Sequence, residues 1–203
     1  MAIENGQTAR PVVPADLQAI LDELDRTDQQ ARLLIAGLSE AQINWQPGGG
    51  TGWSVAQCLD HLVQATTLYT PALQAAVHKA KGSPGHTWKP IQPGWLGRWF
   101  IRELEPPPKR KLKSPKKAVP AAQLKGAEVL KAYVAAHDQV RALIDEVREM
   151  DLNRIRFRNP FLRLLPWTVG TGLMIIGAHD RRHLWQAEQV LKAMDQASAT
   201  KTA

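Results

Sequence analysis

The chain has 203 residues, of which 44% are hydrophobic and 22% charged, and its formal net charge is +7. This composition is typical of one globular domain with a substantial core, and the single cysteine, Cys58, excludes an internal disulfide framework. We expect a cytoplasmic protein with no membrane partner, because the sequence shows no signal peptide and no apolar run of about 20 residues.

The positive charge is concentrated in one segment. Six basic residues lie between Lys109 and Lys117, and without them the net charge would fall from +7 to +1. This segment has no interleaved aromatic residues for base stacking, so we predict a solvated connection and no specific nucleic-acid partner. Binding of an anionic ligand by this segment is the alternative.

The first half of the chain predicts two long helices. Residues 1–15 are polar and contain prolines, so we expect a flexible arm. Asp16 begins a helix that ends near Gly37, and its apolar residues recur at helical spacing. A loop rich in glycine follows, bracketed by Trp45 and Trp53, which we expect to pack this loop onto the helices; a platform for a cofactor is the alternative.

A second helix is predicted to begin at Ser54, with Gln57 completing a capping box. His61 lies on this helix, at the edge of its apolar face. The next segment, residues 82–120, is rich in proline, glycine and lysine, and only Trp95–Arg102 is expected to be helical within it.

The second half of the chain predicts two further long helices. The third runs from about Ala121 to Val147, with His137 on its apolar face, and the fourth begins near Thr168. No strand pattern of credible length is present. Four long helices with one extended crossover predict an all-α four-helix bundle over residues 16–195, followed by a flexible tail at 196–203.

Two histidines in the last helix indicate a metal site. His179 and His183 are four residues apart, which places both imidazoles on one helical face. Two imidazoles so placed can bind one transition-metal ion, and His61 from the second helix is the candidate third ligand. Three protein ligands leave a position open for water or substrate, as in catalytic metal sites. The alternative is histidines that are hydrogen-bonded within the core.

Three further residues have candidate roles near the metal site. Asp180 is a candidate general base; the alternatives are a residue on the helix surface or one that supports the metal ligands from behind. Gln186 lies seven residues after His179, on the same side of the helix. We expect it to hydrogen-bond a metal-bound water or substrate, to orient a ligand imidazole, or to be a polar residue that ends the buried stripe. We expect His137 to be a core residue or to support the ligands, in preference to binding the metal itself.

Rival metal sites are less consistent with the sequence. A ferritin-like di-metal site needs Glu-x-x-His motifs, and no glutamate here is followed by histidine three residues later. A zincin-like peptidase needs His-Glu-x-x-His, whereas this chain has aspartate, Asp180, at the second position.

The segment NWQPGGGTGWSVAQCLDHL (residues 44–62), together with HDRRHLWQ (179–186), resembles the DinB-like (DinB/YfiT) superfamily. The resemblance spans about residues 16–194. It implies a four-helix bundle, often a homodimer, whose divalent metal is held by three histidines, here His61, His179 and His183.

The resemblance implies a metal-dependent enzyme acting on a small-molecule substrate. One group of relatives are transferases or isomerases that use a low-molecular-weight thiol, which the metal would hold as thiolate. A hydrolase that activates water is the alternative, and a non-catalytic ligand-binding module is another. The metal is a divalent ion such as zinc, nickel or iron, because imidazole suits all three.

Overall fold

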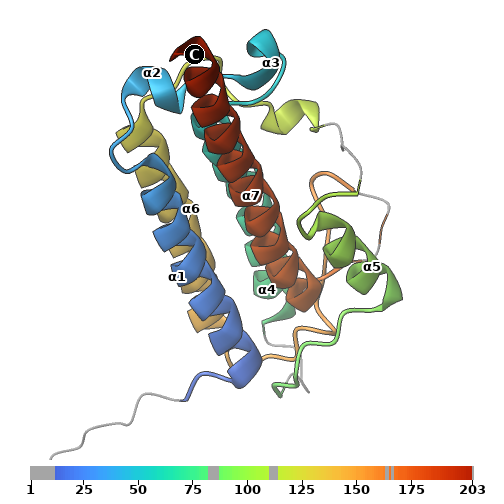
Figure 1. Ribbon diagram of the computed structural model, residues 1–203. Coiled ribbons are helices and arrows are strands. Elements are labelled where there is room, and N and C mark those ends of the chain that lie inside the picture. The colour runs from blue at the N-terminus through green and yellow to red at the C-terminus, as the bar shows by residue number, and fades with distance from the viewer. Residues whose placement is uncertain (1–11, 82–86, 110–113, 163–164, 166, 203) are drawn as a thin grey trace, which may run out of the picture.

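Four long helices form the framework that the sequence predicts (Figure 1). The computed structural model describes residues 12–81, 87–109, 114–162, 165 and 167–202. The long helices are α1 (Ala15–Ile35), α4 (Val55–Ala80), α6 (Gly126–Glu146) and α7 (Val169–Thr202). The structure differs from the predicted C-terminal tail, because residues 196–202 continue helix α7.

The helices follow the order α1, α6, α4, α7 around the bundle. Helix α1 packs against α6 and α7, and α4 packs against the same two helices. In the view of Figure 1, α1 and α7 run upwards from their N-terminal ends, whereas α4 and α6 run downwards. Because α4 and α6 are parallel and adjacent, the chain must return along the length of the bundle between them. The predicted crossover is this long connection.

The N-terminus of α4 is fixed by the predicted capping box. Ser54 Oγ accepts a hydrogen bond from the Gln57 amide at 3.2 Å, and Gln57 Oε1 accepts one from the Ser54 amide at 3.0 Å. Gln57 Nε2 also donates to the carbonyl of Ala121 at 3.1 Å. The same side chain therefore stabilises the start of α4 and holds the end of the crossover beside it.

The crossover contains helix α5 (Trp95–Leu104) and a short 3-10 turn, η1 (Lys116–Ala118). Helix α5 extends two residues beyond the predicted end at Arg102. Helix α6 begins at Gly126 instead of Ala121, because the preceding residues bond to other elements: the Ala121 amide donates to Asp60, and the Leu124 amide to Asn44.

Part of the predicted loops lies outside the described residues. These are residues 1–11 of the N-terminal arm, residues 82–86, and Arg110 to Lys113 of the basic segment. The other three members of that segment, Lys109, Lys116 and Lys117, are exposed, as a solvated connection requires.

Two connections hold more regular structure than predicted. The loop after α1 contains two single-turn helices, α2 (Glu40–Ile43) and α3 (Pro47–Gly50). The connection before α7 contains strands β1 (Arg156–Phe157) and β2 (Trp167–Thr168), which pair antiparallel with Phe157 opposite Trp167. Strands of two residues are too short to produce an alternating sequence pattern, so the sequence could not predict them.

The core consists of two apolar clusters separated by a polar level. On α1, Leu24 belongs to one cluster and Ala31 to the other; on α7, Ala178 and Leu184 are divided in the same way. Buried Asp28, His137 and Asp180 lie between them. The bundle core therefore contains a polar level between its two apolar clusters.

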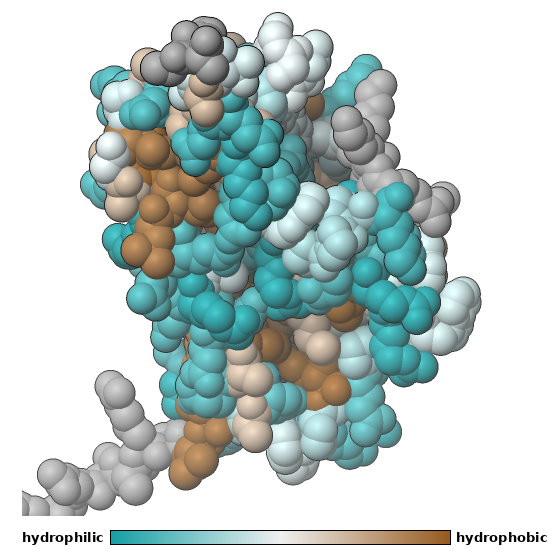
Figure 2. All heavy atoms as spheres, in the orientation of Figure 1, coloured by the Kyte–Doolittle hydropathy of each residue, from teal (hydrophilic) through white to brown (hydrophobic). Residues whose placement is uncertain are grey.

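The surface is mainly polar on the face seen in Figure 2, with smaller hydrophobic patches between hydrophilic residues. No helix among the described residues is both long enough and apolar enough to span a membrane. The one cysteine, Cys58, is buried and free, and burial raises its pKa to about 12. Its thiol is therefore protonated at neutral pH and is a poor nucleophile.

Candidate metal centre

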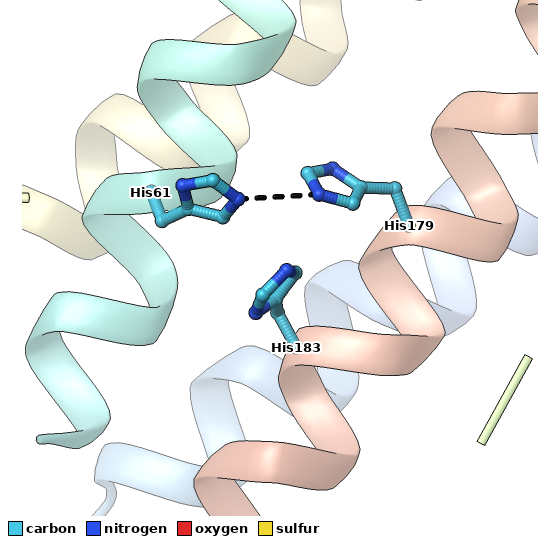
Figure 3. Close-up of side chains that lie close together, drawn as sticks. All are labelled: His61, His179 and His183. Atoms are coloured by element: carbon cyan, nitrogen blue, oxygen red, sulfur yellow. Dashed lines mark hydrogen bonds between the residues drawn. The ribbon is translucent and has the colours of Figure 1, made fainter. Parts of the chain in front are cut away.

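The three predicted histidines meet between two helices (Figure 3). His61 extends from α4, and His179 and His183 extend from successive turns of α7. The Nε2 atoms of His61 and His179 are 3.2 Å apart. His183 completes the group, since one ligand atom from each residue lies within 4.8 Å of the other two.

Hydrogen bonds orient two of these imidazoles. The Nδ1 of His61 lies 2.6 Å from the carbonyl oxygen of Ala118, and the Nδ1 of His183 lies 3.0 Å from Oε1 of Gln186. Both partners are oxygen acceptors, so each Nδ1 carries the proton and donates it. With the proton on Nδ1, Nε2 is the potential ligand atom of both His61 and His183. In the structure Nε2 of His61 accepts a hydrogen bond from Nε2 of His179, which a bound ion would replace (Figure 3). Gln186 orients a ligand candidate, which is one of the roles expected of it.

Burial keeps the imidazoles neutral. It lowers the pKa of His61, and it lowers the pKa of His183 to about 3, where the neighbouring His61 contributes in the same direction. Burial and the two neighbouring histidines also lower the pKa of His179 well below its ordinary value. Neutral imidazole is the form that binds metals, so protons compete weakly at this cluster.

The donor set fits a divalent transition-metal ion. Zinc binds imidazole nitrogen at about 2.0–2.1 Å with tetrahedral geometry, which places two ligand atoms about 3.3 Å apart. The 3.2 Å between the Nε2 atoms of His61 and His179 agrees with this spacing. Among the described residues, these three histidines are the one group of side chains close enough together to hold a metal ion. Three protein ligands would leave a coordination position open for water or substrate.

The cluster lies on the wall of a large pocket. The cavity has a volume of about 750 Å³, within the range of small-molecule sites. Apolar side chains from α4, α5, α7 and the connection before α7 line much of it: Ala65, Phe100, Leu104, Phe161, Leu162, Ile175 and Ile176. Such a wall favours a substrate with an apolar part.

The two tryptophans of the glycine-rich loop have different positions. Trp45 packs against the apolar cluster that contains Val55 and Leu59, as predicted. Trp53 also packs there, but its ring lies 4.9 Å from the His61 ring and 5.8 Å from the His183 ring, and it lines the pocket. Trp53 therefore packs against two of the three imidazoles at the edge of the pocket.

Asp180 does not lie where a general base would be needed. It is 1% exposed and is not among the residues that line the pocket. Its Oδ2 lies 3.3 Å from Nε2 of His137 on α6, within the buried polar level. Asp180 directly follows His179, so it is rotated about 100° around the helix axis and its side chain leaves α7 in a different direction.

His137 is a core residue, as one of the two predictions stated. It is fully buried, and its Nδ1 bonds Asp28 Oδ1 at 2.7 Å. Burial opposes protonation of His137, but the charges of Asp180 and Asp28 outweigh it and raise its pKa to about 9. The protonated imidazole therefore joins α1, α6 and α7 at the polar level.

Sequence reasoning missed parts of the site, among them Arg182 and the backbone carbonyl of Ala118. Arg182 lines the pocket, and its position seven residues after Ile175 could have indicated this. The Ala118 carbonyl, which orients His61, could not be predicted, because any residue type supplies a backbone carbonyl.

Comparisons with known proteins agree with this architecture. The family model of the DinB superfamily matches residues 23–187. The uncharacterised protein YuaE of Bacillus subtilis strain 168 is 25% identical over 171 residues, covering 80% of this chain and 91% of YuaE. A solved structure of YfiT from Bacillus subtilis, described as a probable metal-dependent hydrolase with an unusual four-helix bundle topology, superposes with a TM-score of 0.58. That alignment covers 92% of this chain and 93% of YfiT at 14% identity, so it shows a shared fold.

Proposed function

This chain belongs to the DinB superfamily, and from this premise we propose that it is a metal-dependent hydrolase of small molecules. His61, His179 and His183 would hold one divalent ion, with zinc, nickel and iron as candidates. The observation that carries the proposal is the converging set of neutral imidazoles, two of them oriented through Nδ1, on the wall of a pocket of about 750 Å³. The description of YfiT supports hydrolysis as the reaction class.

A divalent ion, when bound, supplies a Lewis acid that activates water and polarises a substrate carbonyl. The residues of this chain prepare the site for that chemistry. Gln186 and the Ala118 carbonyl fix two imidazole rings, Trp53 packs against them, and the apolar wall holds the substrate. Exclusion of bulk water strengthens each electrostatic interaction in the pocket.

A thiol-dependent transferase is the second candidate, and one observation favours it. No aspartate or glutamate is among the described residues that line the pocket. Hydrolysis is commonly assisted by a carboxylate base, whereas a thiol that reacts as its thiolate needs no such base during the attack. Activity is assayed on a panel of esters, amides and electrophiles, each with and without a low-molecular-weight thiol. This panel distinguishes the hydrolase from the transferase.

The test combines metal analysis with that panel. Purified protein is assayed after dialysis against a chelator and after addition of zinc, nickel or ferrous iron. We expect about one ion per chain and an activity that chelation removes and metal restores. His179→Ala with His183→Ala should lose both the ion and the activity.

His78→Ala is the matched control. His78 is also on α4, but its side chain is 62% exposed and pairs with Glu146, so this variant should keep the ion and the activity. Normal metal content in a folded double variant would contradict the proposed site. A metal-bound protein that is inactive on every ester and amide, yet active once a thiol is added, would favour the transferase.

A further inference from the structure

The pocket contains a cationic side chain that the proposed reaction has not used. Arg182 is 7% exposed and lines the pocket together with His179 and His183. We infer that Arg182 is a specificity-determining residue that binds a carboxylate of the substrate, so that the site takes small esters or amides with an anionic group and an apolar body. This inference rests on the proposed function, because it names the substrate class of the same site.

Helical spacing brings Arg182 to the site. Ile175, Arg182 and Gln186 are separated by seven and four residues, and all three line the pocket. Arg182 Nη1 donates to the carbonyl of Glu103 at 3.0 Å, which ties the guanidinium to the end of α5. A guanidinium has five N–H donors in a fixed plane, and that geometry matches a carboxylate.

The charge of Arg182 acts on the histidine cluster. After burial and the neighbouring imidazoles, this charge contributes to the lowered pKa of both His179 and His183. A permanent positive charge therefore lies close to the place where substrate would react. Acidic residues nearby are Glu103, whose charge acts on Arg182, and Asp60, whose charge acts on His61, and neither lines the pocket.

The charge balance of the pocket favours an anion over a cation. Among the described residues that line the pocket, Arg182 is the one side chain with a permanent charge, and none is a carboxylate. The three histidines of the lining are neutral. A divalent ion on three neutral imidazoles adds further positive charge. In a pocket with apolar walls, such charges are poorly screened by water.

The remainder of the wall is suited to an uncharged body. Phe100 and Leu104 face the cavity from α5, and Ile175 and Ile176 face it from α7. Phe100 and Leu104 are on α5 with Glu103, and the two isoleucines are on α7 with Arg182, so the apolar wall lies on the two helices that the Arg182–Glu103 hydrogen bond joins. An amphipathic molecule can therefore place its anionic group on Arg182 and its chain on this wall.

The inference is tested with octanoate and octanamide, which have the same chain and differ in charge. Their affinities for the full-length protein are measured by isothermal titration calorimetry, in chelator-treated and zinc-loaded samples. We expect octanoate to bind about 10–100-fold more tightly than octanamide in both samples, the usual contribution of a charge-assisted hydrogen bond.

Arg182→Met should remove this preference and leave the affinity for octanamide within about threefold. Arg182→Lys keeps the charge and should retain part of the preference, which also covers the case in which the methionine variant fails to fold. Arg102→Met, at an exposed position of α5, is the matched control and should behave as wild type.

The outcomes separate this inference from the proposed function. A preference for octanoate that depends on zinc and survives Arg182→Met would show that the metal holds the carboxylate, and it would overturn the inference. Equal affinities, or no binding of octanoate at millimolar concentration, would overturn it as well. If the preference depends on Arg182 but no metal binds, the carboxylate-binding role of Arg182 stands and the proposed hydrolase fails.

Discussion

Gln186 Oε1 accepts a hydrogen bond from Nδ1 of His183, one of the three proposed metal ligands. Gln186→Leu removes the acceptor for the Nδ1 proton while keeping a side chain of similar size. We expect the affinity for zinc to fall about 10–100-fold, as is typical when a group that orients a metal ligand is lost. Competition with a chromophoric chelator measures this affinity.

The control is Gln189→Leu, since Gln189 is on the same helix but donates to the carbonyl of Trp185. This variant should bind zinc as wild type does. Unchanged affinity in Gln186→Leu would place Gln186 with the core and not with the site.

His137 should make stability depend on pH. Its folded-state pKa is raised to about 9, above the ordinary value of about 6.5. The contribution of protonated His137 to the free energy of unfolding is therefore complete below about pH 6.5 and is lost as the pH rises through about 9. The contribution is at most about 3 kcal/mol.

Urea unfolding of wild type and His137→Gln between pH 6 and 10 measures this effect. We expect the variant to be less stable at pH 6 and the difference to shrink towards pH 10. His78→Gln, at an exposed position, should keep the wild-type pH dependence. A difference that stays constant over this range would show that His137 does not change its protonation there.

At the scale of elements, the capping box of α4 supports the helix that carries His61. Ser54 is 1% exposed, and its hydroxyl accepts the Gln57 amide hydrogen. Ser54→Ala leaves that amide without its partner and should lower the free energy of unfolding by about 1 kcal/mol. Ser198→Ala, near the exposed end of α7, should change it by less than about 0.5 kcal/mol. Equal effects of the two substitutions would argue against a role of the cap.

Close packing at Gly172 sets how α7 lies against its neighbours. A Cβ atom at this position would lie 2.7 Å from Leu73 Cδ2 and 3.0 Å from Phe157 Cε1, and both side chains are buried. Gly172→Ala should therefore lower stability by about 1–3 kcal/mol through overpacking, although alanine favours helix by about 1 kcal/mol.

Gly94→Ala is the control, because no atom lies within 4 Å of the added Cβ. Gly94 is the N-cap of α5, where alanine is less favourable than glycine, so this variant should lose no more than about 1 kcal/mol in urea unfolding. Stabilisation by Gly172→Ala would mean that Leu73 and Phe157 move aside at little cost.

At the scale of the whole molecule, the metal should join two helices that are far apart in sequence. An ion held by His61 on α4 and by His179 and His183 on α7 binds the folded state alone. Zinc at 100 times its dissociation constant should add about 2.7 kcal/mol to stability and raise Tm by about 5–10 °C. The double variant His179→Ala with His183→Ala should show no shift, and a shift that persisted there would indicate zinc binding elsewhere.

Local patterns were sufficient to predict the bundle. The spacing of apolar residues predicted the four long helices, the Ser54–Gln57 box predicted the start of α4, and a four-residue interval placed His179 and His183 on one face. These features depend on residues close together in the chain, where the 3.6-residue period of the helix fixes which side chains share a face. The same argument predicted that His61 would be near the core.

The sequence by itself therefore determined the helices, their buried faces and the types of residue available for a metal site. The tertiary structure alone decided which of these residues meet. Asp180 turns towards His137 and away from the pocket, Arg182 enters the pocket, and the carbonyl of Ala118 in the crossover orients His61. Each of these contacts depends on how neighbouring helices are rotated and on where a long connection returns. Both are set by the packing of side chains distant in sequence, which no local period encodes.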